Sequence, residues 1–155
     1  AGVEAEATLR TIHYLLDNKE LPDIRMSKFR GTRDVREVSV ETSKREVRVA
    51  SVSGLKKAMK LLDEITSGKK NFDLLEIMTC PEGCVGGGGQ PIPLLENDLK
   101  TRIKLIYDID KNETLNAAHK NLSVRKMYEE FARAPGTEES RLLLHRGFNE
   151  RKILK

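Results

Sequence analysis

The chain has 155 residues, of which 38% are hydrophobic and 34% are charged, and its formal net charge is +4. This length suits one domain, and the apolar fraction is sufficient to build a core. The mild charge does not require a nucleic-acid partner, and no apolar run approaches the roughly 18 residues of a membrane span. Two cysteines are too few for a disulfide-rich secreted fold.

The first residues, AGVEAEATLR, do not contain a basic head followed by an apolar stretch, so no secretion signal is seen. Together with the low cysteine content, this favours a reducing compartment, either the cytoplasm or an organellar stroma or matrix. The chain also lacks an initiator methionine, and we expect it to be processed or to be part of something longer.

Hydrophobic spacing predicts an α/β fold, with a small sheet of three or four strands flanked by helices and a helical segment at the C-terminus. Alternating valines indicate half-buried strands, and apolar residues three and four positions apart indicate helices. In chain order, the expected elements are a helix over 4–17, strands over 35–41 and 46–52, a helix over 55–65, a strand over 72–78, and helices near 98–109, 123–132 and 137–145.

Local signals refine these boundaries. Ser53 is expected to cap the helix that follows it, Gly68 to end that helix one position after its C-cap, and Thr137 to cap the last helix. His13 lies off the apolar stripe of the first helix and is expected on the surface. The apolar face of the helix after Ser53 is expected to contain Leu55, Met59, Leu62 and Ile65, with Ala58 and Leu61 beside it.

The loop over 78–91 carries most of the chemical information. It reads MTCPEGCVGGGGQP and contains both cysteines and five of the 11 glycines. It directly follows a predicted buried strand, where ligands of α/β sheets usually bind. The loop matches neither the phosphate-binding pattern that ends in Gly-Lys-Ser/Thr nor the dinucleotide pattern G-x-G-x-x-G.

Cys80 and Cys84 offer two thiolates that can point to one centre, and soft sulfur ligands favour iron–sulfur clusters, zinc and copper(I). Glycines let the backbone approach such a centre closely. A structural zinc or a cubane cluster usually needs four protein ligands, whereas the histidines of this chain lie far from the loop in the sequence. The pattern therefore indicates half of a metal site. Ordinary small cysteines in a flexible loop, or a redox disulfide, remain open alternatives.

The segment from Met78 to Pro91 closely resembles the last cysteine motif of iron-only (FeFe) hydrogenases, whose usual form is Met-Ala-Cys-Pro-Gly-Gly-Cys followed by glycines and Gln-Pro. The resemblance covers nearly the whole chain, including GVEAEATLRT at 2–11, VRVASVSGLKKAMKLL at 47–62 and the helices between Leu105 and Leu144. It implies that 1–155 is a single C-terminal lobe of a larger hydrogenase catalytic (H-cluster) domain, with a cluster loop over 78–91 and a helical tail over 98–145.

The resemblance also implies roles for three residues. Cys80 would bind the cubane 4Fe–4S cluster, Cys84 would bridge that cluster to the two-iron subcluster, and Met78 would pack beside the two-iron unit. The family's other cluster cysteines and its proton-relay cysteine come from motifs earlier in its chain, and none of those motifs is present here. We therefore expect the isolated chain to be inactive and to bind no cluster.

Two residues of the motif depart from the family's usual form. Thr79 replaces an alanine, and Glu82 replaces a small residue beside the cluster. A carboxylate at that position would repel an anionic cluster unless it points to water. We also expect Cys84 and Gly86–Gly89 to be mobile without metal, because a glycine run has high conformational entropy.

The function implied by the resemblance is that of the C-terminal portion of an iron-only hydrogenase, which in the complete protein would oxidise dihydrogen reversibly. The alternatives are a hydrogenase-like iron–sulfur protein, of the cytosolic iron–sulfur assembly or prelamin-recognition type, and a sensory hydrogenase. The expected partners are the remainder of the hydrogenase chain or a partner subunit and a ferredoxin-like electron carrier, with no nucleic acid and no membrane.

Overall fold

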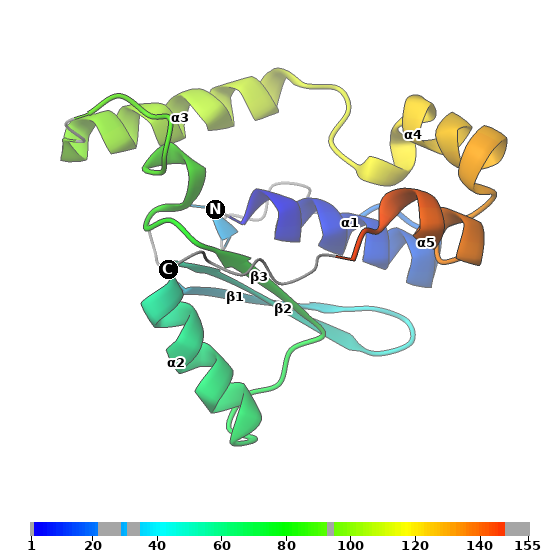
Figure 1. The fold of residues 1–155 in the computed structure, drawn as a ribbon, viewed down its shortest axis with the longest axis horizontal. Helices are drawn as coiled ribbons and strands as arrows, with labels where there is room; N and C mark the ends of the chain where they lie inside the picture. The colour runs from blue at the N-terminus through cyan, green and yellow to red at the C-terminus, as the bar shows by residue number, and fades with distance from the viewer. Residues whose placement is uncertain (1, 22–28, 31–34, 93–94, 148–155) are drawn as a thin grey trace, which may run out of the picture. The chain divides into compact units, whose positions relative to one another are not determined.

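The computed structural model describes residues 2–21, 29–30, 35–92 and 95–147 (Figure 1). The chain divides into two compact units, Ala1–Ala117 and Ala118–Lys155. In the described ranges the elements are α1 (Val3–Asp17), β1 (Val35–Glu41), β2 (Glu46–Ser53), α2 (Leu55–Thr66), β3 (Leu74–Met78), η2 (Gly83–Val85), α3 (Glu96–Asn112), η3 (Ala118–Lys120), α4 (Leu122–Met127), η4 (Tyr128–Ala132) and α5 (Glu138–Leu144). The predicted α/β fold is confirmed.

A three-stranded sheet in the order β1-β2-β3 organises the first unit. β1 and β2 form an antiparallel hairpin, whereas β3 pairs in parallel with β2. Thr42 closes the hairpin, because its N–H and its hydroxyl both donate to the carbonyl of Arg45, at 3.1 and 2.7 Å. Because the strand order is β1-β2-β3, β2 is the central strand of the sheet.

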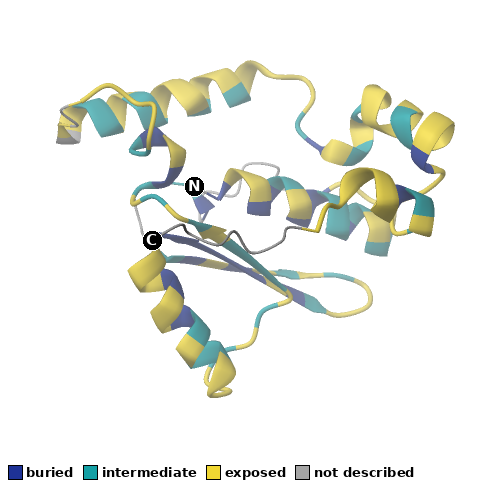
Figure 2. Cartoon of the chain, viewed as in Figure 1, coloured by how far each residue is buried: buried dark blue, intermediate teal, exposed yellow. Residues whose placement is uncertain are grey.

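Helices α1 and α2 cover opposite faces of this sheet (Figure 1). Side chains alternate between the two faces along a strand, so Val49 of β2 belongs to the core beneath α1 and the next residue, Ala50, to the core beneath α2. Most of β2 is consequently buried, as Figure 2 shows. No helix of the described residues is long and apolar enough to cross a membrane.

The boundaries of α2 differ from the prediction at one end. Ser53 does not cap the helix, because it is the last residue of β2, and Gly54 takes the N-cap position with a φ of 91°. The N–H of Gly54 donates to the carbonyl of Met78 at 2.8 Å, so the chain stays bound to β3 until the glycine turns it. At the other end, Gly68 follows the C-cap with a φ of 74°, as predicted.

The prediction that His13 lies on the surface was wrong. The residue is 7% exposed and sits near the C-terminal end of α1. Its Nδ1 lies 2.9 Å from the carbonyl oxygen of Lys19, and its Nε2 lies 3.4 Å from Oδ2 of Asp17. Both ring nitrogens therefore have polar neighbours, which allows the ring to be buried.

A buried ion network joins α1 to α3. The Glu6 side chain is 4% exposed and is paired with both Arg10 and Arg30. Nη2 of Arg30 lies 2.9 Å from Oε1 of Glu6 and 2.6 Å from Oδ2 of Asp110. Burial alone would lower the pKa of Arg30, but the hydrogen bonds to Glu6 and Asp110 outweigh it and raise that pKa. The network thus holds charged groups in a region that water does not reach freely.

Short helical segments make up the described part of the second unit. Asn121 caps α4, since its side chain accepts from the N–H of Ser123 at 3.0 Å. α4 continues into η4, a single π-helical turn, and the chain then turns at Arg133 with a φ of 58°. Thr137 caps α5 as predicted, accepting from the N–H of Ser140 at 3.3 Å.

Replacement of Glu6 by glutamine should destabilise the chain, because Arg10 and Arg30 lose their shared buried carboxylate. Breaking one partner out of a buried ion pair costs about 3–5 kcal/mol, and urea denaturation should show a loss of that size in the free energy of unfolding. The matched control is Glu130→Gln, which removes an exposed partner of Lys126 and should cost under about 0.5 kcal/mol. Equal losses would contradict a role for the network.

Candidate metal-binding site

The cysteine loop starts where β2 and β3 both end. Ser53 and Met78, the last residues of the two strands, are register partners. Because parallel strands end at one edge of a sheet, ligands of α/β folds usually bind just beyond that edge. Cys80 follows β3 by two residues and is therefore held close to the sheet, whereas Cys84 lies further along, in the turn η2.

A tight turn separates the two cysteines. The N–H of Gly83 donates to the carbonyl of Cys80 at 3.1 Å, and Glu82 and Gly83 adopt left-handed φ values of 61° and 66°. Both thiols are free: Cys80 is partly buried and Cys84 is exposed. The turn thus reverses the chain between two thiols that could each serve as a metal ligand.

One glycine of the loop is required by close packing. A Cβ added to Gly87 would lie 3.0 Å from Sγ of Cys80 and 3.1 Å from the carbonyl oxygen of Gly83. At Gly88 and Gly89 an added Cβ would meet no atom within 4 Å. The need for a glycine beside the sulfur is therefore specific to position 87, and the mobility expected for the glycine run stays a prediction.

Arg102 of α3 fastens the glycine-rich segment at both ends. Its guanidinium donates from Nη1 to the carbonyl of Val85 at 3.1 Å and from Nη2 to the carbonyl of Pro91 at 3.2 Å. Between these two points, Nε2 of Gln90 donates to the carbonyl of Cys84 at 3.2 Å. The loop is consequently held by side-chain donors on its carbonyl groups.

The sequence analysis did not identify Arg102 as a site residue, although its position among the apolar residues of its helix indicated a buried partner. The residue lies three positions after Leu99 and one before Ile103, so it stands within the apolar stripe of its helix. A cation on an apolar stripe suggests that its charge has a partner inside the protein. Here the partners are backbone carbonyl groups of a loop that lies elsewhere in the chain.

A small pocket of about 100 Å³ adjoins the loop. It brings together Met78 and Cys84, two of the three residues predicted for the site, whereas Cys80 is outside its lining. The remaining walls are mostly apolar and come from α1, η2 and α3; the residues are Val3, Glu4, Val85, Ile103, Ile106 and Tyr107. A ligand of Cys84 would therefore meet hydrocarbon on several sides.

The described residues offer two sulfur donors and no third partner beside them. No group of three or more His, Cys, Asp or Glu residues in the described ranges could hold a metal ion. His13 is engaged at the end of α1, and His119 and His145 belong to the second unit or its last described turn. The donor set thus fits one side of a larger metal centre.

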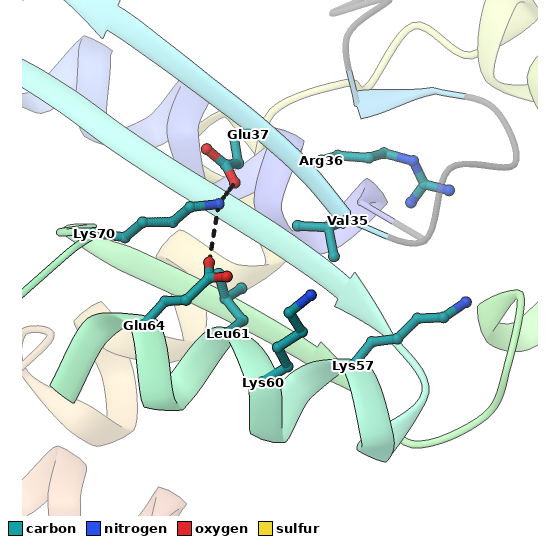
Figure 3. A pocket seen from close by; sticks show the side chains of 8 residues that line it. All are labelled: Val35, Arg36, Glu37, Lys57, Lys60, Leu61, Glu64 and Lys70. Atoms are coloured by element: carbon teal, nitrogen blue, oxygen red, sulfur yellow. Dashed lines mark hydrogen bonds and ion pairs between the residues drawn. The ribbon is translucent and has the colours of Figure 1, made fainter. Parts of the chain in front are cut away.

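A second pocket, of about 560 Å³, lies between β1 and α2 (Figure 3). Nζ of Lys70 bridges two carboxylates there, at 2.5 Å from Glu37 and 3.3 Å from Glu64. The hydrogen bond to Glu37 is the main cause that raises the pKa of Lys70. The lining contains charges of both signs and no residue of the cysteine loop, so the two pockets are separate sites.

Comparison with known families agrees with the geometry. Residues 1–88 match the model for the iron only hydrogenase large subunit, C-terminal domain, and residues 96–151 match the model for the iron hydrogenase small subunit. The chain belongs to the iron-only hydrogenase family. The resemblance that the cysteine motif indicated is thereby confirmed.

Individual hydrogenases align over almost the whole chain. The NADP-reducing hydrogenase subunit HndD of Solidesulfovibrio fructosivorans is 33% identical over 99% of the chain, and iron hydrogenase 1 of Clostridium pasteurianum is 31% identical over 93%. The chain spans 26% of the length of each. Among solved structures, the FeFe hydrogenase HydA1 from Chlamydomonas reinhardtii gives a TM-score of 0.75 at 30% identity, covering 91% of this chain and 42% of that one.

A second group of relatives is named for a different role. The cytosolic Fe-S cluster assembly factor narfl of Danio rerio is 27% identical over 73% of the chain. This group was expected as the alternative from the cysteine motif. Its presence means that family membership alone does not assign the hydrogenase reaction to this chain.

Substitution of Gly87 by alanine should disturb the loop, because the new Cβ would press on the Cys80 sulfur 3.0 Å away. Overpacking of this kind usually costs about 1–3 kcal/mol, and we expect a loss of that size in unfolding free energy. Gly88→Ala is the matched control, since nothing lies within 4 Å of the added carbon. Equal stability of the two variants would show that the loop can shift to make room for the added carbon without a loss of unfolding free energy.

Substitution of Arg102 by methionine should loosen the segment between Val85 and Pro91. Hydrogen bonds to charged groups contribute about 1.5–3 kcal/mol each, so amide exchange at Gly86–Gly89 should become roughly tenfold faster or more. Lys104→Met removes an exposed cation from the same helix and should leave these rates unchanged. Unaltered exchange in the Arg102 variant would mean that other contacts hold the loop.

Proposed function

We propose that the chain is the C-terminal part of an iron-only hydrogenase and that Cys80 and Cys84 are two of the protein ligands of its H-cluster. The observation that carries this proposal is the placement of two free thiols on one short loop, with Cys84 lining a pocket beside Met78. Membership of the hydrogenase family supports the same function.

The donor chemistry suits a partial iron–sulfur site. Thiolates are soft ligands that iron–sulfur clusters prefer, and Gly87 leaves space beside the Cys80 sulfur that any side chain would fill. Two cysteines are half of the set that a cubane cluster usually needs. The other ligands would come from the rest of the protein, so the isolated chain should be inactive and free of cluster.

The roles of the individual residues follow from the family motif. Cys80 would bind the cubane cluster, Cys84 would bridge it to the two-iron subcluster, and Met78 would pack beside the latter. When bound, the cluster would supply the electron chemistry that interconverts protons and dihydrogen. Arg102 would keep the ligand loop in position through the carbonyls of its two ends, and the apolar side chains of α3 would limit the access of water.

Exposed apolar side chains support the remainder of a hydrogenase as the main partner. Leu55 and Met59 of α2 are 55% and 59% exposed, and Ile109 of α3 is 62% exposed. Large apolar side chains that gather on a surface commonly mark an interface. We propose that the rest of the hydrogenase chain, or a partner subunit, covers them and that a ferredoxin-like carrier delivers electrons to the assembled protein.

The assembly-factor function is the second candidate, and one residue of the loop favours it. Glu82 places a half-buried carboxylate between the two cysteines, where negative charge disfavours an anionic cluster. A cluster protein without hydrogenase activity, or a sensory hydrogenase without high activity, would tolerate the resulting shift in potential. Assay of dihydrogen evolution by the assembled protein distinguishes these functions.

The compartment is proposed from the cysteines alone. Two free thiols suit a reducing interior, either the cytoplasm or an organellar stroma or matrix. The relatives include both a periplasmic hydrogenase large subunit, from Nitratidesulfovibrio vulgaris, and cytosolic assembly factors. The family therefore occurs in more than one compartment, and the compartment of this chain stays a prediction.

Cluster ligation is tested by a graft. The matching 149 residues of Clostridium pasteurianum iron hydrogenase 1 are replaced by this chain, the hybrid is reconstituted anaerobically with iron and sulfide, and the cluster is followed by electron paramagnetic resonance. We expect a 4Fe–4S signal that Cys80→Ser and Cys84→Ser each reduce strongly. Thr79→Ala, which restores the family's usual residue, should retain it.

Two outcomes of the graft experiment would refute cluster ligation. One is a signal that survives the loss of both cysteines, which would mean that the ligands lie elsewhere. The other is a stable 4Fe–4S signal in the isolated chain, which would contradict the count of two ligands.

A further inference from the structure

Helix α3 forms one wall of the pocket beside Cys84, yet little apolar burial holds it there. Ile103, Ile106 and Tyr107 line the pocket from this helix. None of the α3 side chains whose burial is described is buried, and Ile106 is 42% exposed. Because packing of a buried apolar face stabilises most helices in proteins, the position of α3 depends more than usual on its polar contacts.

Two arginines supply such contacts at different points of α3. Arg102, on the helix itself, donates to the carbonyls of Val85 and Pro91. Further along the helix, Asp110 accepts from Nη2 of Arg30 at 2.6 Å. The two points are about two helical turns apart, and the residues of α3 that line the pocket lie between them in the sequence. The helix is therefore fastened on both sides of the pocket wall that it forms.

Glu6 of α1 fixes the orientation of Arg30. Nε of Arg30 lies 3.3 Å from Oε2 of Glu6, and Nη2 lies 2.9 Å from Oε1. Two bonds from one guanidinium to one carboxylate define the plane of the guanidinium. The Glu6 side chain is 4% exposed, so this contact is protected from water. Arg30 is consequently a fixed bridge from α1 to Asp110.

This bridge lies about one helical turn from the pocket on both helices. Glu6 comes three residues after Val3 of α1, and Asp110 comes three residues after Tyr107 of α3. Residues three apart share a helix face, and Val3 and Tyr107 both line the pocket. The Arg30 guanidinium also lies 4.9 Å from the centre of the Tyr107 ring, where a cation is attracted to the ring face. The bridge is thus continuous with the pocket wall.

We propose that Arg30 is a positioning residue of the cysteine site. Through Asp110 and Tyr107 it holds α3 beside α1, and α3 in turn forms the pocket wall and brings Arg102 to the carbonyls of the cysteine loop. Arg30 is not part of the pocket lining, so it acts through the helix. Loss of the bridge releases α3 at one end and loosens the loop that the other end holds.

Amide exchange in the metal-free chain tests this role. Asp110→Ala removes the acceptor on α3 and leaves Arg30 bound to Glu6. We expect exchange at Gly86–Gly89 to become roughly tenfold faster, as for the loss of one hydrogen bond to a charged group. Exchange at Val49, in the core of the central strand, should not change.

Asp108→Ala is the matched control, because it makes the same substitution at an exposed position of the same helix. It should leave the exchange rates of the loop unchanged. Asp110→Glu keeps the carboxylate and should retain rates close to those of the unaltered chain. Unchanged rates in Asp110→Ala, or equal acceleration in Asp108→Ala, would overturn the proposal.

A double variant separates positioning from a general loss of stability. If Arg30 acts through α3, Asp110→Ala should add little to the effect of Arg102→Met, because both release the same contact of the helix with the loop. Independent effects would instead multiply. Multiplied rates, or an acceleration that includes Val49, would contradict positioning. Circular dichroism shows whether each variant is folded, and Asp110→Asn, which keeps the size of the side chain, replaces Asp110→Ala if the latter unfolds.

The effect on a cluster rests on the proposed function and is measured in the reconstituted graft. We expect Asp110→Ala to shift the g values of the 4Fe–4S signal, because the loop that carries both cysteines is loosened, while Asp108→Ala keeps the parent spectrum. An unchanged spectrum in a graft that holds its cluster would refute this effect on the cluster. A parent graft without a signal would instead refute the proposed function, and the exchange rates of the chain are independent of that result.

Discussion

The parallel pairing of β3 with β2 is the constraint on which the candidate site depends. It brings the last residues of both strands to one edge, where the N–H of Gly54 donates to the carbonyl of Met78 at 2.8 Å. The chain must leave the sheet at that edge, so the position of Cys80 is set by the ladder of β3. The same pairing aligns Glu76 with Ser51 on the face that α1 covers. One pairing therefore sets where the cysteine loop leaves the sheet and which face of β3 the first helix covers.

Much of the fold could be predicted because β1 and β2 carry alternating valines and β3 is a short apolar run. The three strands and the positions of the longer helices are as expected, and Gly68 and Thr137 act at the helix ends as predicted. The errors arise where tertiary contacts override local pattern. Ser53 is held in the sheet, and α2 packs through Ala58, Leu61 and Ile65, whereas Leu55 and Met59 of the predicted apolar face are exposed. Which part of a broad apolar face meets the sheet depends on how the helix is rotated against the strands, which periodicity does not reveal.

Candidate site residues could be predicted only where the type of the side chain itself indicates the chemistry. Two cysteines and a methionine in a known motif could be named directly, whereas the contacts that shape the loop could not. Arg102 binds backbone carbonyls, which have the same chemistry at every position and so leave no pattern in the sequence. Among Gly87, Gly88 and Gly89, the structure distinguishes Gly87 by its closeness to a sulfur atom.

Glu82 shows what holds the ligand loop in shape. The residue has a φ of 61°, where the family usually has a glycine, and a left-handed conformation costs a side-chain-bearing residue roughly 1–2 kcal/mol. The conformation must therefore be imposed by its surroundings, which include the bond from Gly83 to Cys80 at 3.1 Å and the contacts of Arg102 with the carbonyls further along. These contacts are formed by protein groups alone. The conformation of the loop between the two cysteines is thus held by contacts within the polypeptide itself.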